Sequence, residues 1–364
     1  MPLHDLTEKI NIINEIYDSL SDQESKDIFD MRIDYFMYRD AESFIDAYKK
    51  YVTPSWGKFH GFEEFYRKKM KQTDSDIPII IVPAGDFGEK SKLALEMKGY
   101  KVDIFADNYR CGDIDNIPIV KVSEINNQYT GDYVCILSVD SKVVKRSLHK
   151  QLLDSGVPEE NIFIVPFGSL LINNNQQYFD SDIVKRGDEE IFLDCGSCDG
   201  ITSIGFERWA GSSAKKIIAL EPFDDAFRMV QENLKDSKCE IELHKVAAWN
   251  KETELKFKSD SNLGSTAICS TGDITVKAQK IDDILNGQKI TFLKMDIEGS
   301  ELAALQGAEN TIRLYKPKLA ICIYHKPEDI IDIPYYIYSL QQGYKFYIRH
   351  YAYPSTGETV LYCL

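Results

Sequence analysis

The spacing of apolar residues predicts a helical region over residues 1–72. Aromatic and aliphatic side chains at positions 29, 33 and 36 follow the i, i+4, i+7 spacing of one helical face. Ser21 and Glu24 precede them at the spacing of a capping box, which predicts a helix N-terminus there. Tyrosine and phenylalanine are dense in this region. We therefore expect these helices to pack on the next domain or on a second subunit in a homodimer.

Short apolar runs then alternate with helical segments. The first run ends in Gly85 and Gly88, which is typical of a strand that passes through a tight turn into a helix. Strands that alternate with helices at this spacing predict a parallel, doubly wound sheet of the Rossmann type over residues 73–172. Its predicted strands lie in "IPIIIVPAGDFG", "YKVDIFADN", "YVCILSVD" and "NIFIVP".

A second alternating set predicts another doubly wound α/β domain over residues 173–364. Phe227, Val230 and Leu234 give one of its helices an apolar stripe. Only "PSTGE" separates the last two predicted strands, so they must form an antiparallel hairpin at the end of the parallel sheet. The predicted strands are "EIFLDC", "KIIALEP", "IELHKVAAW", "ITFLKMD", "LAICIYH", "YKFYIRHYAY" and "TVLYCL".

The net charge and the hydropathy of the sequence limit the kinds of molecule that we expect the protein to bind. The 43 basic and 58 acidic residues give a net charge of −15, which disfavours nucleic acid as a partner. No apolar run reaches the roughly 18–20 residues that span a bilayer, so we expect no membrane partner. The N-terminal "MPLHDLTEKI" has an early acid and no apolar core of a signal peptide. These features predict a cytoplasmic protein.

The stretch "LDCGSCDG" at 193–200 permits two interpretations. Cys195 and Cys198 have the C-x-x-C spacing of a redox pair or half a zinc site. The same stretch has Asp194, Gly196 and Gly200 in a D-x-G-x-x-x-G pattern at the carboxyl end of a predicted strand, where open α/β sheets bind ligands. No second C-x-x-C or C-x-x-H follows at zinc-site spacing. We favour the cofactor loop.

A second acid supports this choice. Glu221 ends the next predicted strand, 27 residues after Asp194 (221 − 194), where it is well placed to hold ribose hydroxyls. Together with the "AAW" after the third strand and the terminal hairpin, the pattern indicates the class I fold of methyltransferases that use S-adenosylmethionine.

From residue 185 onward the sequence resembles the FkbM family of S-adenosylmethionine-dependent methyltransferases. The resemblance is carried by "FLDCGSCDG", "IIALEPF", "VAAW", "PKLAICIYHKPEDIIDIPYYI" and above all "KMDIEGSELAALQGA". The sequence departs from the family pattern at Ser197, where alanine is common, and at the Ile201–Thr202 pair, where Asp-Thr is common. Neither change removes a backbone donor.

The resemblance implies a site for S-adenosyl-L-methionine. Asp194, Gly196, Ser197 and Gly200 would line its methionine end, and Glu221 would bind the ribose hydroxyls. Pro222 and Phe223 would lie beside the adenosine, with Ala247 near the adenine. The family's implied activity is O-methylation of a sugar or other small-molecule hydroxyl in surface-glycan or secondary-metabolite biosynthesis.

The acceptor side needs a base, because a hydroxyl must lose its proton on methylation. Positioned bases add about 10²–10⁴-fold. His325 is the preferred candidate, since an unperturbed histidine titrates near pH 6.5. Asp296 and Glu298 come at the end of the neighbouring predicted strand and are the other candidates. Together with His325 they would also suit a divalent metal. The spacing of the three residues is not diagnostic of a metal site, so we predict no metal. Glu301 is expected only to cap the next helix or to place a favourable negative charge in its first turn. Ser265 is expected to line the cleft.

Two other functions stay open. The 73–172 domain has Asp107 at the end of its second strand, as in a dinucleotide site, but it lacks a full G-x-G-x-x-G. It would serve a nicotinamide-dependent oxidoreductase or a nucleotide-sugar-binding protein. The alternative, which we favour for this domain, is a structural or dimerising role in which it packs against the catalytic domain. A scaffolding protein that kept the fold without the activity is the third reading, against which the intact cofactor residues argue.

Overall fold

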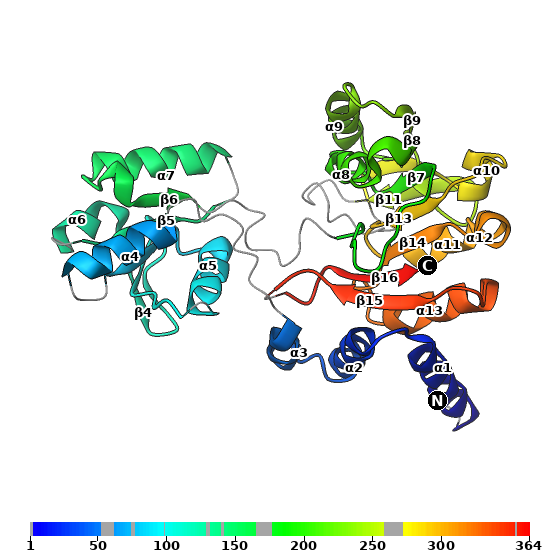
Figure 1. The fold of residues 1–364 in the computed structure, drawn as a ribbon, viewed down its shortest axis with the longest axis horizontal. Helices are drawn as coiled ribbons and strands as arrows, with labels where there is room; N and C mark the ends of the chain where they lie inside the picture. Colours follow the sequence, from blue (N-terminus) through cyan, green and yellow to red (C-terminus); the bar gives the residue numbers. More distant parts are fainter. Residues whose placement is uncertain are drawn as a thin grey trace. The chain divides into compact units, whose positions relative to one another are not determined.

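The computed structural model describes residues 3–51, 62–73, 77–97, 99–128, 132–139, 142–164, 177–257, 272–353 and 355–364. The chain forms two compact units (Figure 1). The middle unit comprises Lys49–Asn174 with Ala352–Pro354. The main unit comprises Met1–Tyr48, Asn175–Tyr351 and Ser355–Leu364. Among the described residues no helix combines the length and apolar character needed to cross a membrane.

The units divide the chain at places other than the predicted boundaries at 72 and 172. Helices α1 (Leu3–Ser19), α2 (Gln23–Tyr38) and α3 (Ala41–Tyr48) belong to the main unit, whereas α4 (Phe62–Thr73) belongs to the middle unit. The predicted helical region is therefore shared between two bodies. Each part is held by the sheet or helices against which its apolar face packs.

The middle unit is built on a six-stranded sheet of order β3-β4-β2-β1-β5-β6. All neighbouring pairs are parallel except β3–β4. Its strands are β1 (Ile79–Val82), β2 (Ile104–Ala106), β3 (Gly112–Ile114), β4 (Ile117–Val120), β5 (Val134–Leu137) and β6 (Ile162–Ile164). Its other helices are η1 (Lys49–Tyr51), α5 (Asp86–Met97), η2 (Val122–Glu124), α6 (Ile125–Gln128), α7 (Lys142–Asp154) and η3 (Glu159–Asn161).

The main unit has a seven-stranded sheet of order β15-β16-β14-β13-β7-β8-β9. The five strands from β14 to β9 in this order are parallel, and β16 pairs antiparallel with both β14 and β15. This confirms the doubly wound sheet with a terminal antiparallel hairpin. The strands are β7 (Glu190–Cys195), β8 (Ala214–Leu220), β9 (Glu240–His244), β13 (Phe292–Met295), β14 (Lys318–Cys322), β15 (Phe346–His350) and β16 (Thr359–Cys363).

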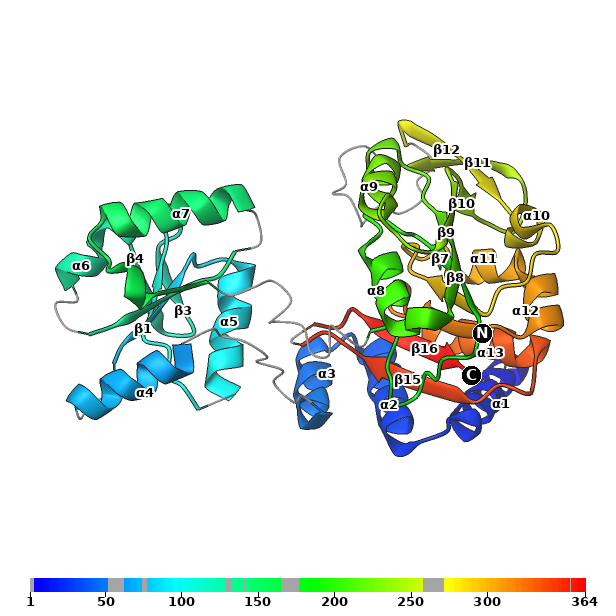
Figure 2. The ribbon, with the colours of Figure 1, turned by 45° about the horizontal axis from the view of Figure 1, so that its top comes forward.

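Helices cover both faces of the main sheet (Figures 1 and 2). Helices α8 and α9 contact each other on one side, and α11, α12 and α13 contact one another on the other side. Their bounds are α8 (Ile201–Ala210), η5 (Gly211–Ser213), α9 (Asp224–Leu234), α10 (Ile281–Leu285), α11 (Glu301–Gln306), α12 (Glu309–Tyr315) and α13 (Asp329–Leu340). Stacked phenylalanines fill the core beneath α8, with Phe192 and Phe206 rings 4.6 Å apart.

The sequence analysis did not predict one strand pair and one small sheet. In the middle unit β3 is a short edge strand that pairs with β4, and the Asp and Asn residues around their turn resemble a loop in sequence. In the main unit β10 (Ala247–Ala248), β11 (Thr253–Phe257) and β12 (Ile274–Gln279) form a separate three-stranded sheet. This small sheet buries Leu255, Phe257 and Val276 on one face.

The N-terminal helices are attached to the terminal hairpin. Asp22 caps α2 by accepting the Ser25 N–H at 2.8 Å, and its carboxylate also pairs with Arg349 of β15 at 2.6 Å. The predicted capping residue, Ser21, instead donates its N–H to the Phe346 carbonyl. The sequence prediction of the cap was wrong by one residue, because α2 begins at Gln23 and Asp22 therefore holds the cap position, while Leu20 forms a parallel bridge with Phe346.

Candidate active site

The loop after β7 approaches the neighbouring strand end too closely for a side chain. Gly196 has φ +78, and a Cβ there would lie 2.0 Å from the Asp296 carbonyl oxygen. Gly200 has φ +79 and precedes α8. Both positions favour glycine because L-residues rarely adopt this backbone conformation. The amides of Gly196 and Ser197 both donate to the Leu220 carbonyl, which fixes the loop against β8.

Asp194 lies beneath this loop and not on its open side. Its side chain is fully buried, and β7 and β13 place it directly opposite Lys294, with Oδ1 and Nζ 3.0 Å apart. Ser203 donates to Oδ2 at 2.7 Å, and Lys294 also donates to the Gly196 carbonyl at 2.7 Å. Burial opposes the charge on Lys294, but Asp194 outweighs it and raises the lysine's pKa. The Asp194 carboxylate therefore positions the loop, whereas the sequence analysis had expected it to meet a ligand.

A pocket of about 260 Å³ opens at the carboxyl ends of β7, β8 and β13. Several residues predicted to hold the cofactor line it: Gly196, Glu221, Pro222, Phe223 and Ala247. Ser197 and Gly200 are not among its lining residues, because Ser197 is buried against Leu220. Leu255 and Phe257 of the small sheet add apolar walls that the sequence analysis missed.

Glu221 is well placed for hydroxyl recognition. One carboxylate oxygen accepts the Cys198 N–H at 2.9 Å and the other accepts the Phe223 N–H at 3.0 Å. Each oxygen keeps a further lone pair for a ligand. Burial raises the pKa of this carboxyl group. The apolar wall opposite suits a flat, uncharged ring, so the pocket fits an adenosine-like ligand with two ribose hydroxyls.

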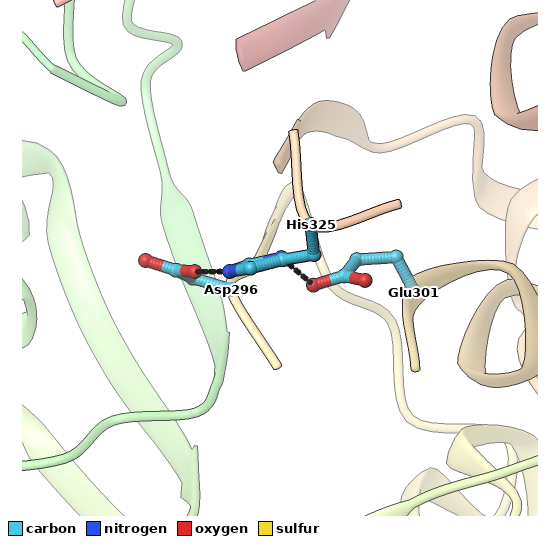
Figure 3. Close-up of side chains that lie close together, drawn as sticks. All are labelled: Asp296, Glu301 and His325. Atoms are coloured by element: carbon cyan, nitrogen blue, oxygen red, sulfur yellow. Dashed lines mark hydrogen bonds and ion pairs between the residues drawn. The ribbon is translucent and has the colours of Figure 1, made fainter. Parts of the chain in front are cut away.

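An acid–base cluster lies at the adjoining ends of β13 and β14. His325 lies between Asp296 and Glu301, with a ring nitrogen toward each (Figure 3). Its Nδ1 is 2.9 Å from Glu301 Oε1, and its Nε2 is 3.4 Å from Asp296 Oδ1 and 3.5 Å from Glu298 Oε2. Asp296 and Glu298 also line the pocket. The structure thus brings together the three predicted acceptor-side residues.

The cluster shifts its own pKa values. Burial alone would lower the pKa of His325, but Glu301, Asp296 and Glu298 together raise it to about 9. Burial raises the pKa of Glu298 to about 7, with His325 opposing the shift. The histidine expected to titrate near its ordinary value is therefore a stronger base, held as a cation at neutral pH.

Three contacts around the cluster were not foreseen. Glu301, expected only to serve the first turn of α11, is fully buried and accepts the Ile297 N–H at 2.9 Å as well as facing His325. Tyr178 donates to Asp296 Oδ2 at 2.8 Å, and Tyr324 to Oδ1 at 3.3 Å. Tyr178 lies in the polar stretch "NNNQQYFDSD", which resembles a linker and gives no signal for such a role.

Two other predictions concern metal and sulfur. Donor atoms of Asp296, Glu301 and His325 lie within 4.8 Å of one another, a separation that would suit a metal ion. Because Glu301 already hydrogen-bonds the backbone and Nδ1, we interpret the trio as an acid–base cluster.

Both thiols of the C-x-x-C are free, and burial raises the pKa of Cys195 strongly and that of Cys198 to about 11. Neither thiol is activated. Ser265 lies outside the described residues.

In the middle unit, the residues around the loop with Gly85 and Gly88 make their contacts with the protein's own backbone. Asp107, the candidate ribose ligand, accepts the N–H groups of Ala84, Tyr109 and Arg110 at 3.1, 2.7 and 2.9 Å. A Cβ on Gly88 would lie 2.2 Å from the Pro83 carbonyl, so that glycine serves close packing of α5 on β1. These contacts give the carboxylate a structural role.

Comparison with known proteins gives a family match within the main unit. Residues 194–346 match the model of the methyltransferase FkbM domain. A methyltransferase FkbM from Methylobacillus flagellatus KT shares 21% identity over 92% of this chain and 99% of its own, with a TM-score of 0.48. Aeropyrum pernix fibrillarin, solved with S-adenosyl-L-methionine, shares 9% over 49% and 67%, with a TM-score of 0.33. No curated protein matches the chain. The family match therefore covers residues 194–346 and not the whole chain.

Proposed function

We propose that the protein methylates a hydroxyl group of a sugar or other small molecule, using S-adenosylmethionine, from the premise that residues 194–346 match the methyltransferase FkbM domain. The single observation that carries the proposal is the junction of the pocket with the acid–base cluster. Asp296 and Glu298 line the pocket and lie within 3.5 Å of His325 Nε2. A donor and a proton acceptor thus share one edge of the sheet.

The pocket fits the proposed cofactor. Glu221 would receive the ribose hydroxyls, and Phe223, Ala247 and Leu255 would enclose the adenine. Gly196, which lines the pocket, lets the loop pack closely against the Asp296 carbonyl beside the ligand's position. When bound, S-adenosylmethionine supplies a methyl group on a positively charged sulfur. The carboxylates of Asp296 and Glu298 suit that charge.

His325 would take the acceptor's proton. Glu301 holds the ring through Nδ1, and Nε2 faces Asp296 and Glu298, the two carboxylates that line the pocket. Methylation of the hydroxyl releases its proton, and Nε2 of His325 would accept that proton. Only neutral His325 accepts it, so the rate should rise with pH toward about 9.

Labelled methyl transfer tests the proposal. The protein is incubated with ¹³C-methyl S-adenosylmethionine and a panel of sugars, nucleotide sugars and phenols. The carbon chemical shift of the product distinguishes O-methyl from N-methyl and C-methyl groups. Transfer to oxygen that is lost in His325→Gln supports the proposal, and transfer to another atom contradicts it. Glycan biosynthesis, a cytoplasmic location and a homodimer stay predictions of the sequence.

A further inference from the structure

A second cavity lies on the other side of the catalytic histidine. It measures about 170 Å³ and is lined by Arg32, Tyr35 and Arg39 around the end of α2 and by Tyr324, His325 and Lys326 after β14. All six residues belong to the main unit. We call this cavity the Arg32 pocket. Four of its lining residues are cationic at neutral pH, Arg32, Arg39, Lys326 and the protonated His325, in a chain whose net charge is −15.

Arg32 has no counter-ion among the described residues. Its exposed fraction is 4%, and its Nε and Nη2 are buried without a hydrogen-bond partner. Aromatic rings provide its neighbours: the guanidinium carbon lies 5.1 Å from the centre of the Phe44 ring and 6.0 Å from that of Tyr35. Burial lowers its pKa to about 10, so the group stays charged at neutral pH.

An unpaired buried charge is costly to a folded protein. Buried guanidinium groups are normally paired with a carboxylate or a phosphate, because desolvation is otherwise uncompensated. Their planar N–H fork matches both anions. Arg39 and Lys326 are exposed and leave the pocket open toward solvent on a cationic side. The pocket therefore has the charge, size and donors for one small anionic group.

Its position relates this anion to the reaction. His325 lines the Arg32 pocket, while its Nε2 lies 3.4 Å from Asp296 and 3.5 Å from Glu298, both of which line the cofactor pocket. A molecule anchored in the Arg32 pocket would thus lie beside the base that faces the methyl donor. Tyr324 packs on His325, with ring centres 4.1 Å apart, and completes the shared wall.

We propose that the Arg32 pocket binds a carboxylate or phosphate group of the methyl acceptor, so that the substrate class is an anionic hydroxyl compound. This inference rests on the proposed methyltransferase function. It adds that Arg32 recognises the acceptor and takes no part in proton transfer.

Thermal unfolding of the full-length protein tests the proposal with two probes, inorganic phosphate and acetate, each against sodium chloride of equal ionic strength. A ligand that binds only the folded state raises Tm with its concentration. We expect one or both anions to raise the Tm of the wild type. In Arg32→Met the apparent affinity should fall at least about tenfold, as losing charged hydrogen bonds requires. Arg208→Met, at an exposed site in α8, is the control and should behave as wild type.

The variant also separates recognition from structure. Removing a buried charge that lacks a partner should leave the ligand-free Tm unchanged or raised, whereas removing a structural arginine would lower it. Arg32→Lys keeps the charge without the fork and should bind the anion more weakly than wild type. Stabilisation by phosphate alone indicates a phosphorylated acceptor, and stabilisation by acetate alone a carboxylated one.

Two results would overturn the inference: no anion-specific stabilisation of the wild type, or stabilisation that persists in Arg32→Met. Titration of the same samples with S-adenosylhomocysteine separates the two proposals. If it binds equally to wild type and Arg32→Met while anions do not bind, only the anion pocket is wrong. If it binds to neither, the methyltransferase proposal itself fails.

Discussion

Glu301→Gln is the most informative single change in the acid–base cluster. The substitution removes a buried negative charge and retains the shape of the side chain. Glu301 Oε1 accepts both the Ile297 N–H and the His325 contact, while Oε2 is buried without a partner. The glutamine carbonyl can take over both contacts, so the change isolates the charge.

The expected effect is a lower pKa for His325. An opposite charge at hydrogen-bond distance typically raises the pKa of a histidine by about 1–3 units. Glu301 is the largest of the influences that raise the pKa of His325 to about 9, and burial acts in the opposite direction. Without that charge the midpoint should therefore fall by about 1–3 units.

Two assays read this midpoint. The first follows the imidazole signals of ¹⁵N-labelled protein by NMR between about pH 5 and 10, and it needs no acceptor. The second follows kcat/KM of methyl transfer, whose rise with pH reports the base of the free enzyme. Glu309→Gln, in an exposed pair with Arg313, is the matched control and should leave the midpoint unchanged. An unchanged or raised midpoint in Glu301→Gln would refute the reasoning.

Other variants and conditions test separate parts of the site. Gly196→Ala should abolish cofactor binding in calorimetry, because its Cβ would meet the Asp296 carbonyl at 2.0 Å. Arg349→Met should reduce the free energy of unfolding by about 1–3 kcal/mol in urea titration, since Asp22 loses its charged partner; no loss would show that the helix is held otherwise. Raising the pH from 6.5 through about 9 should lower the free energy of unfolding by about 3 kcal/mol, because His325 binds its proton more tightly in the folded than in the unfolded protein. A free energy of unfolding that does not change over this pH range would exclude this coupling.

The sequence predicted the sheets well because buried parallel strands leave a plain signal. Apolar runs that end in Gly or an acid marked β7, β8 and β13, and their parallel order brought Glu221 and Asp296 to one edge. The edge strand β3 gave no such signal, since it is only three residues long and Gly112 and Asp113 are exposed. Register was also beyond the pattern, and it decides the position of Asp194: pairing of β7 with β13 sets it opposite Lys294.

Side-chain partners from distant segments explain the other differences at the site. His325 was expected near its ordinary pKa because its three carboxylate neighbours could not be located from spacing. Tyr178 reaches Asp296 from a stretch 118 residues earlier. Arg32 could not be associated with His325 because nothing in the sequence shows that α2 packs near the end of β14. Contacts of this kind depend on tertiary packing, which hydrophobic periodicity does not encode.

Calorimetric titration with S-adenosylmethionine, S-adenosylhomocysteine and NAD tests the central claim most directly, using wild type, Glu221→Gln and the exposed control Glu232→Gln. The account predicts that both adenosyl ligands bind wild type and the control, that Glu221→Gln weakens them at least about tenfold, and that NAD does not bind. Binding of NAD alone, unaffected by Glu221→Gln, would place the active site in the middle unit and contradict the account.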